Sequence, residues 1–257
     1  MPTTPSASPK PLRGLGAMIR YQMPYTVFYP AVFIFSIGLP VFMYFMFGAF
    51  QDYASRWNGH SNVSGQVMFA MGAYGATLAA ASIGAQVGVE RGMGFSRQLA
   101  LTAMRPRTYL LGKLVLSLLS ALFALLTLML VGAIVGAEAE VRAWVFSPLL
   151  ILFGSLVTAC MGVAFGYLFR SDAAYGIIGG GSAILAFLAG IWIPLEQMPE
   201  FFRDLAPYTP VYGVFQLSQL PLRDTTFNPA WVANIAAWIA LFGVIALWRM
   251  RRDTSRR

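Results

Sequence analysis

The side chains able to take part in chemistry are few in this chain, and most of them gather in one short stretch. Glu90 and Arg91 open the stretch, Arg97 lies inside it and Lys113 follows it, between two long apolar runs. One carboxylate among cations supplies ion pairs and hydrogen bonds, but no pair of groups for acid-base catalysis. We therefore expect this segment to contact another molecule and not to catalyse a reaction.

Other kinds of site find little support in the sequence. The one cysteine, Cys160, lies in an apolar run, and the one histidine, His60, lies in a polar loop, so a metal site or a Cys/His nucleophile is not indicated. The chain has no G-x-x-x-x-G-K-[ST] pattern, which predicts that it holds no ATP site of its own. We expect neither a cofactor nor an enzyme activity in this chain.

The elements that position these residues are predicted to be membrane helices. Apolar residues make up 58% of the chain and charged residues 11%, whereas a soluble domain carries about 25% charged residues. The apolar residues form runs long enough to cross a hydrocarbon core of about 30 Å. These runs show no alternation of period two, so the fold class is an all-α integral membrane protein.

Six spans are expected within one transmembrane domain over residues 26–249. Their predicted bounds are Thr26–Phe50, Gln66–Val89, Thr108–Gly136, Ala143–Phe169, Ala173–Pro194 and Pro229–Trp248. With both termini in the cytosol, all but four of the 18 Lys and Arg residues lie on the cytosolic side, as the positive-inside rule requires. The net charge of +8 thus reflects topology and gives no reason to expect nucleic-acid binding.

The segments outside the spans have distinct compositions. Residues 1–11 are rich in Pro and Ser, which predicts a disordered tail. Residues 12–25 place apolar side chains on one helical face, which predicts an interfacial amphipathic helix; the alternative is a partly ordered juxtamembrane tail. The outer loop 195–228 is expected to form one or two short helices that dip into the outer leaflet, and residues 250–257 a basic cytosolic tail.

The segment 90–105 has an apolar ridge between its charges. Phe95, Leu99 and Thr102 follow a spacing of four and three residues, so they share one face of a helix. Such a helix suits a groove on a partner protein. The alternative is a solvated connector whose arginines only obey the positive-inside rule, but a connector has no reason to expose these apolar residues.

The chain resembles the permease subunits of ABC-2 type exporters, in the group that includes drug- and antibiotic-export permeases. The motifs that carry the resemblance are Glu90-Arg91, Gly94, Arg97-Gln-Leu, Thr102 and Tyr109-Leu-Leu-Gly-Lys113, then Gly190-Ile-Trp-Ile-Pro through Arg203 and Ala206-Pro-Tyr-Thr-Pro210. Six spans with cytosolic termini also match that family. Many members read Thr-Pro where this chain reads Thr102-Ala103, with the proline at Pro106 instead.

The resemblance implies a homodimer in a bacterial plasma membrane that binds two copies of a separate ATPase, which holds the ATP and magnesium. Residues 90–105 would be the coupling helix that docks on the ATPase. The residues expected at this interface are Glu90, Arg91, Gly94, Phe95, Arg97, Leu99, Leu101 and Met104.

Glu90 needs a partner or water, because an acid at the edge of a membrane is costly. Arg91, Arg97 or a basic residue of the interfacial helix would link it to the docking segment; the alternative is a carboxylate exposed at the headgroups. Lys113 is expected to extend to the membrane surface.

Two stripes of small residues are expected to let helices approach closely. They are Gly176 and Gly180 in the fifth span, and Ala80, Gly84 and Gly88 in the second. Ordinary packing explains them, and surfaces that slide during gating are the functional alternative.

A substrate path is indicated only by aromatic and amide side chains. The candidates are Phe35, Phe42, Tyr74, Gln86 and Phe187. For the aromatic residues of the first span, contact with lipid and the membrane interface is the favoured explanation, and Pro40 is expected to kink that span. The near absence of ionisable groups inside the spans disfavours a secondary transporter or channel.

The sequence therefore predicts the membrane subunit of an ATP-driven exporter for a drug-like or lipid substrate. A permease for a glycan and a membrane scaffold or sensor without transport activity are the alternatives.

Overall fold

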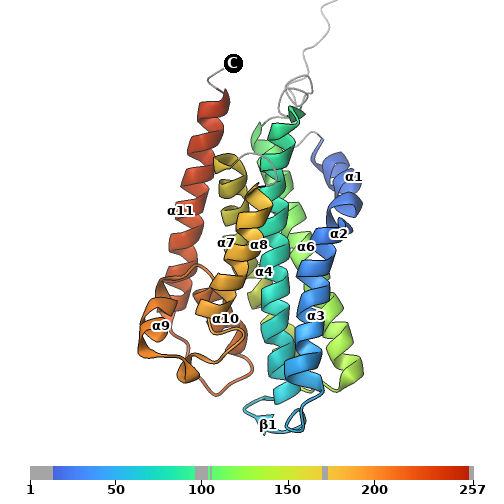
Figure 1. Cartoon of the computed structure of the whole chain (residues 1–257), viewed down its shortest axis with the longest axis vertical. Helices are drawn as coiled ribbons and strands as arrows, with labels where there is room; N and C mark the ends of the chain where they lie inside the picture. The colour runs from blue at the N-terminus through green and yellow to red at the C-terminus, as the bar shows by residue number, and fades with distance from the viewer. Residues whose placement is uncertain (1–13, 96–103, 105, 170–172, 255–257) are drawn as a thin grey trace, which may run out of the picture.

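The computed structural model describes residues 14–95, 104, 106–169 and 173–254 (Figure 1). Apart from a two-stranded hairpin, the regular elements in this part of the chain are helices. The described chain begins with α1 (Leu15–Val27) and ends with α11 (Pro229–Thr254) at the same end of the bundle, the upper end in Figure 1. We call it the basic end, because Arg91, Arg107 and the arginines of the last turns of α11 lie there.

Helix α4 (Val63–Gly92) is the centre of the bundle, and α6 (Pro106–Val135) and α7 (Val141–Leu168) pack against it. Small residues make this possible. A β-carbon on Gly84 would collide with the backbone of Gly162 and Val163 in α7, and one on Gly162 would collide with the carbonyl of Ala81. The two backbones therefore meet directly, which is how membrane helices gain packing energy without a hydrophobic driving force between them.

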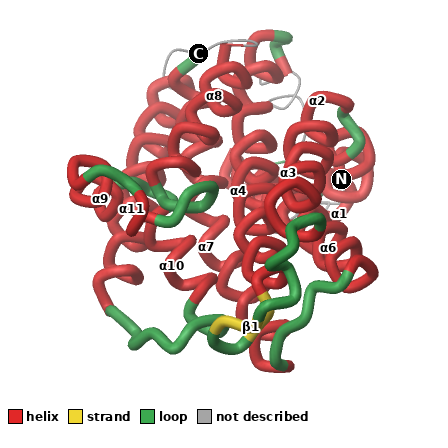
Figure 2. Tube along the Cα trace, turned by 60° about the horizontal axis from the view of Figure 1, so that its bottom comes forward, coloured by secondary structure: helices red, strands yellow, loops and turns green. Residues whose placement is uncertain are grey.

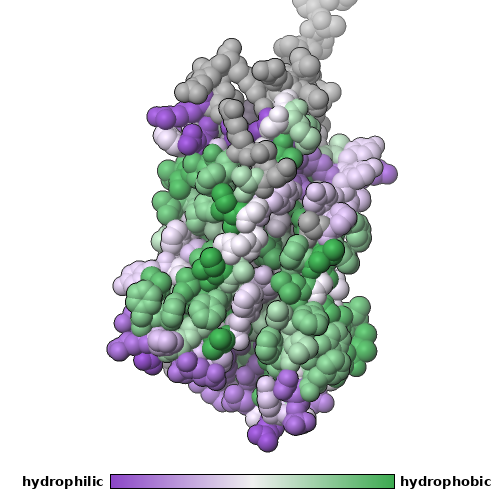
Figure 3. Space-filling model, viewed as in Figure 1, coloured by the Kyte–Doolittle hydropathy of each residue, from purple (hydrophilic) through white to green (hydrophobic). Residues whose placement is uncertain are grey.

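Four helices are long and apolar enough to span a membrane, namely α4, α6, α7 and α11. The apolar helices Ile34–Ala49 and α8 (Ala173–Leu188) are shorter. Hydrophobic residues cover the middle of the molecule and hydrophilic ones gather at its two ends, as Figure 3 shows for one face. The prediction of a helical membrane protein is thus confirmed, and four of the six predicted spans correspond to helices of full spanning length.

The first predicted span begins later than the sequence indicated. Thr26 belongs to α1, and the next helix starts at Pro30, because proline disfavours helical backbone in the residue before it and is well suited to a first helical turn. The run continues as α2 (Pro30–Phe33), a π segment (Ile34–Gly38), α3 (Leu39–Tyr44) and a second π segment (Phe45–Ala49). Pro40 is the second residue of α3, just after the first π segment, so its missing N–H is accommodated by a local change of hydrogen-bond pattern.

Helix α8 is shorter than the predicted fifth span, which extended to Pro194. The helix stops at Leu188, and Gly190 adopts a positive φ of 83°. The N–H of Ile191 donates to the carbonyl of Ala186 and that of Gly190 to Phe187, both at 3.0 Å, which is a Schellman motif. A glycine four residues before Pro194 therefore ends the helix early.

The opposite end of the bundle carries the hairpin of β1 (Trp57–Asn58) and β2 (Ser61–Asn62), and we call it the hairpin end (Figure 2). Between α8 and α11, the chain forms 3-10 turns at Leu195–Gln197 and Ala206–Tyr208, α9 (Glu200–Leu205) and α10 (Tyr212–Gln219). Helix α10 is largely buried, with Val214 against Gly154 of α7. Its backbone is therefore covered by protein.

Candidate functional site

An ion pair between α4 and α6 lies at the basic end of the bundle. Lys113 Nζ is 2.5 Å from Glu90 Oε1, and the Lys113 side chain is completely buried. Tyr109, one turn before Lys113, donates its hydroxyl to the other carboxylate oxygen of Glu90. Gln86, one turn before Glu90, accepts from Lys113 Nζ at 3.3 Å. Four side chains on two helices thus satisfy one another inside the protein.

This arrangement corrects two expectations about the charges. Lys113 does not extend to the membrane surface, because a carboxylate and an amide oxygen lie within its reach in the interior. Among the described residues, the partners of Glu90 are Lys113 and Tyr109, not Arg91 or Arg20 of α1, whereas Arg97 lies outside the described residues. A buried cation is tolerated only when it is paired and hydrogen-bonded, and this network supplies both conditions.

Arg91 ties the same end of α4 to α7. Its guanidinium donates to the backbone carbonyls of Gly166 at 3.1 Å and Tyr167 at 2.9 Å. It also lies 4.9 Å from the centre of the Tyr167 ring, within the range of a cation–π contact. These carbonyls belong to the last turn of α7, which lacks partners within its own helix. Glu90 and Arg91 therefore fasten α4 to two different helices from adjacent positions.

The chain turns sharply after this anchor. Helix α4 ends at Gly92, and Gly94 has a positive φ of 77°, a conformation that glycine adopts without strain. Glu90 and Arg91 are therefore part of α4, and a separate coupling helix would begin only after Gly94. The ring of Phe95 lies 6.0 Å from that of Tyr109, against the buried network.

The returning end of the segment also meets the bundle. Met104 is half-buried, and a β-carbon on Gly14 would touch its side chain. Helix α1 packs on α6 nearby, with Met18 against Gly112. Arg97, Leu99 and Leu101, which we expect at the partner interface, lie outside the described residues. The segment thus begins at Phe95, against Tyr109 of α6, and returns at Met104, against Gly14 at the start of α1.

The comparisons with known proteins identify the family. A family model described as an ABC-2 family transporter protein matches residues 57–249, well over half of the chain. The chain belongs to the ABC-2 transporter family. One relative, named "Putative transport permease YvfS", of Bacillus subtilis (strain 168), is 24% identical over 233 residues, which cover 86% of this chain and 91% of that protein. Membership indicates an ABC-2 permease, a transport subunit rather than an enzyme.

The small-residue stripes of this ABC-2 permease lie in different surroundings. Ala80 and Gly84 are buried where α4 meets α7, and a β-carbon on Gly88 would crowd the carbonyls of Gly166 and Phe169. In contrast, a β-carbon on Gly176 or Gly180 would have no described neighbour within 4 Å. The stripe on α4 packs inside the protein, and the stripe on α8 faces outward. A role of either stripe in gating stays a prediction.

The residues predicted for a substrate path do not come together in the permease. Phe35 and Phe42 are both 57% exposed on the outside of the helical run from Pro30 to Ala49. Tyr74 is buried with its ring 5.4 Å from Trp192, and Phe187 contacts Phe202. Gln86 belongs to the network of Lys113. The described residues therefore offer no single path lined by this set.

His60 is a residue of the permease whose place the sequence did not reveal. Its Nδ1 lies 2.8 Å from Glu140 Oε1 and its Nε2 lies 2.7 Å from Asp224 Oδ1. The hydrogen bonds to Glu140 and, with a smaller effect, Asp224 raise the pKa of His60 above its usual 6.5, while desolvation and the charge of Arg142 oppose them. We call this contact the His60 clamp. It joins the hairpin, the start of α7 and the loop before α11.

Sequence reasoning missed both the network around Lys113 and the His60 clamp, but only the network has a signal in the local sequence. Gln86 and Glu90 are four residues apart, as are Tyr109 and Lys113, so each pair shares a helix face; this spacing could have indicated the network. In the His60 clamp, Glu140 lies 80 residues and Asp224 164 residues from His60 along the chain. No local spacing signals such a contact.

Proposed function

We propose that this permease is the membrane subunit of an ATP-driven exporter, and that it works as a homodimer with two copies of a separate ATPase in a bacterial plasma membrane. ATP and magnesium would be bound by the ATPase chains. Residues 95–104 would dock on the ATPase, and the permease would move a hydrophobic or amphipathic substrate, drug-like or lipid, out of the cell. Family membership supports a transport role, and the geometry of the basic end supports the coupling role.

The observation that carries the proposal is the double anchor at Glu90 and Arg91. A force applied to the segment after Gly94 reaches α6 through the Glu90–Lys113 pair and α7 through the carbonyls of Gly166 and Tyr167. Coupling requires a contact whose energy differs between two states of the transporter. A docking segment fastened to three packed helices moves them together, whereas a solvated connector would not.

The topology that we propose has six spans with both termini in the cytosol. The helical run from Pro30 to Ala49 contains 20 residues, or about 30 Å at the α-helical rise, which is sufficient to cross the hydrocarbon core. Helix α8 is shorter, and the chain after it continues through residues 189–211 to the buried helix α10. The arginines of the basic end favour the cytosol for that end.

A second copy of the chain fits the outward face of α8 and the first membrane helix. Tyr29 stacks on Tyr175 at 6.3 Å, so the two helices lie together at one end. Both present unpartnered apolar surface, with Ile184 63% and Phe35 57% exposed, beside the stripe of Gly176 and Gly180. Small residues let two such faces approach closely. This is the face on which we place the homodimer.

The composition of the bundle supports the proposed substrate class. Most of its buried side chains are apolar, which suits an amphiphile better than an ion. A glycan is the second candidate, because aromatic rings such as Phe35 and Phe42 could stack on sugars. A scaffold or sensor without transport is the third.

The experiment that tests the coupling role uses the tagged permease expressed together with its ATPase. Phe95→Asp and Leu99→Asp should abolish co-purification of the ATPase, or uncouple its activity from transport, while the permease still inserts in the membrane. The control is Val141→Asp, which places the same charge on an exposed side chain at the hairpin end. Normal transport by both variants would reject the coupling role. An intact complex whose ATPase activity no substrate stimulates would favour the scaffold.

A further inference from the structure

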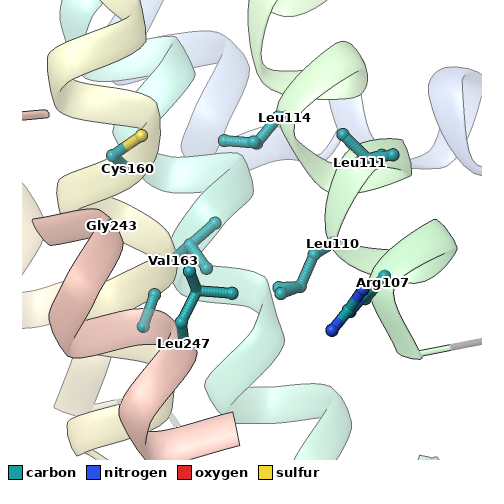
Figure 4. Close-up of a pocket in the computed structure, with 9 residues that line it drawn as sticks. Arg107, Leu110, Leu111, Leu114, Cys160, Val163, Gly243 and Leu247 are labelled. Carbon is teal, nitrogen blue, oxygen red and sulfur yellow. The ribbon is translucent and has the colours of Figure 1, made fainter. Parts of the chain in front are cut away.

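A cavity of about 320 Å³ lies between α6, α7 and α11, apart from the network of Lys113 and the proposed dimer face (Figure 4). Its volume is at the lower end of the roughly 300–1,000 Å³ of small-molecule sites. The wall is apolar, with Leu110 and Leu114 on α6, Val163 on α7 and Leu247 on α11. Arg107 is the one charged residue among those that line the cavity.

The cavity is a channel that runs along the helices from the basic end toward the middle of the bundle. Arg107 and Leu247 lie at one end of it and Leu114 and Cys160 at the other (Figure 4). Seven residues separate Arg107 from Leu114, which corresponds to about 10 Å along a helix. The site therefore has one charged end and is otherwise lined by apolar side chains and Cys160.

Among the residues that the structure describes, none neutralises Arg107. It lies in the first turn of α6 and is exposed, and within the described part of the chain it forms no hydrogen bond or ion pair. The guanidinium of arginine matches the oxygens of a phosphate or carboxylate in geometry and charge. An anion bound at this end of the cavity would form an ion pair with the guanidinium of Arg107.

The side of the cavity faces the membrane. Leu111 and Leu247, from two of its three helices, are 48% and 45% exposed, and both belong to helices long and apolar enough to span the bilayer. An apolar cavity gives water too few hydrogen-bond partners to hold it. The material that lies beside these helices is the hydrocarbon of the surrounding lipid.

We propose that this cavity binds one acyl chain of a resident anionic phospholipid, with the lipid phosphate on Arg107. The lipid comes from the leaflet at the basic end, where Arg249, Arg251 and Arg252 on α11 add positive charge. The bound acyl chain would fill the space between α6 and α11 and would support α6, the helix that follows the docking segment. The inference goes beyond the proposed transport and does not require it.

The test is photolabelling of the full permease in nanodiscs. The probe is a phospholipid with a diazirine near the end of one acyl chain, as phosphatidylglycerol or as phosphatidylcholine, and labelled peptides are mapped by mass spectrometry. We expect phosphatidylglycerol to label the cavity-lining parts of α6 and α11 about fivefold more than phosphatidylcholine, the factor that corresponds to one basic side chain at an anionic surface. Equal labelling by the two lipids, or label spread evenly over all helices, would overturn the proposal.

Two variants separate the headgroup from the chain. Arg107→Gln should abolish the preference for phosphatidylglycerol and leave phosphatidylcholine labelling unchanged. Gly243→Phe should lower labelling by both lipids, because a β-carbon there has no described neighbour within 4 Å and the ring can enter the cavity. The controls are Arg20→Gln, an exposed arginine at the basic end, and Gly16→Phe, an open glycine of α1; both should label as the wild type does.

Two results would contradict the proposal. A preference for phosphatidylglycerol that survives Arg107→Gln would contradict it even if Gly243→Phe failed to fold. Release of the bound lipid when the assembled transporter hydrolyses ATP would show that the lipid is cargo and not a resident.

Discussion

At the scale of single residues, Lys113 is the most demanding feature of the fold. Its ammonium group is completely buried between two membrane helices, and it is tolerated because Glu90 neutralises it and Gln86 and Tyr109 complete the network. Removing one member of a buried ion pair is more harmful than removing both, since the survivor remains charged without a partner.

We therefore predict that Lys113→Met and Glu90→Gln each destabilise the permease by about 3–5 kcal/mol. The double variant should lose less than the sum of the two, because it leaves no uncompensated charge. The measurement is a double-mutant cycle of unfolding in detergent. Additive losses would mean that the two side chains do not depend on each other.

At the scale of elements, the His60 clamp shows how loops far apart in the sequence are fixed to one another. Both ring nitrogens of His60 contact a carboxylate oxygen, and both can donate only when the imidazole is protonated. The backbone strengthens the contact, since His60 N–H donates to the carbonyl of Leu222 at 2.9 Å and Glu140 N–H to that of His60 at 2.9 Å. Arg142, 3.2 Å from Glu140, competes for the same carboxylate.

The clamp predicts a pH dependence of stability with a definite sign. Because the pKa of His60 is raised in the folded protein, its contribution is fully present below the unfolded value near 6.5 and is lost as the pH rises through the higher folded value. The thermal midpoint of the wild type should therefore fall toward that of His60→Gln as the pH increases from about 6 to 9, a range that straddles the ordinary pKa of histidine. A constant difference between the two across this range would show that His60 is not protonated in the clamp.

At the scale of the whole molecule, one small-residue stripe is buried inside the bundle and the other faces outward. The stripe of α4 is used inside the chain, against α7, whereas Gly176 and Gly180 of α8 have no described neighbour within 4 Å. A membrane protein that leaves such a face unpartnered is expected to use it for a contact between subunits.

The proposed dimer face predicts that larger side chains on α8 separate the two copies without unfolding them. Gly176→Leu and Gly180→Leu should convert the dimer to a monomer, because larger side chains prevent close approach of the second copy, and the thermal midpoint of the monomer should stay unchanged. Light scattering during size-exclusion chromatography in detergent measures the mass. Gly16→Leu, at an equally open glycine of α1, is the control. A persistent dimer in both α8 variants would place the interface elsewhere.

Much of this architecture could be predicted from sequence because hydrophobic length decides which segments become membrane helices. Three of the four long spans match their predicted ranges within three residues, and the fourth, α11, starts at the predicted Pro229 but runs on to Thr254. Local backbone chemistry was harder to foresee: Pro30 delays the first membrane helix and Gly190 ends α8 early. The partners of Glu90 required knowing that α4 and α6 are neighbours with a particular register, which charge counting cannot provide.

The two π segments of the first membrane helix have a consequence for how that helix presents its side chains. Each widened turn acts as an insertion of one residue, and one residue rotates everything beyond it by about 100° around the helix axis. Phe35 and Phe42 are both outward, although seven residues and part of a π segment separate them. Deleting a single residue between Ile34 and Gly38 would thus redirect the aromatic face of one half of the helix relative to the other while leaving the helix continuous.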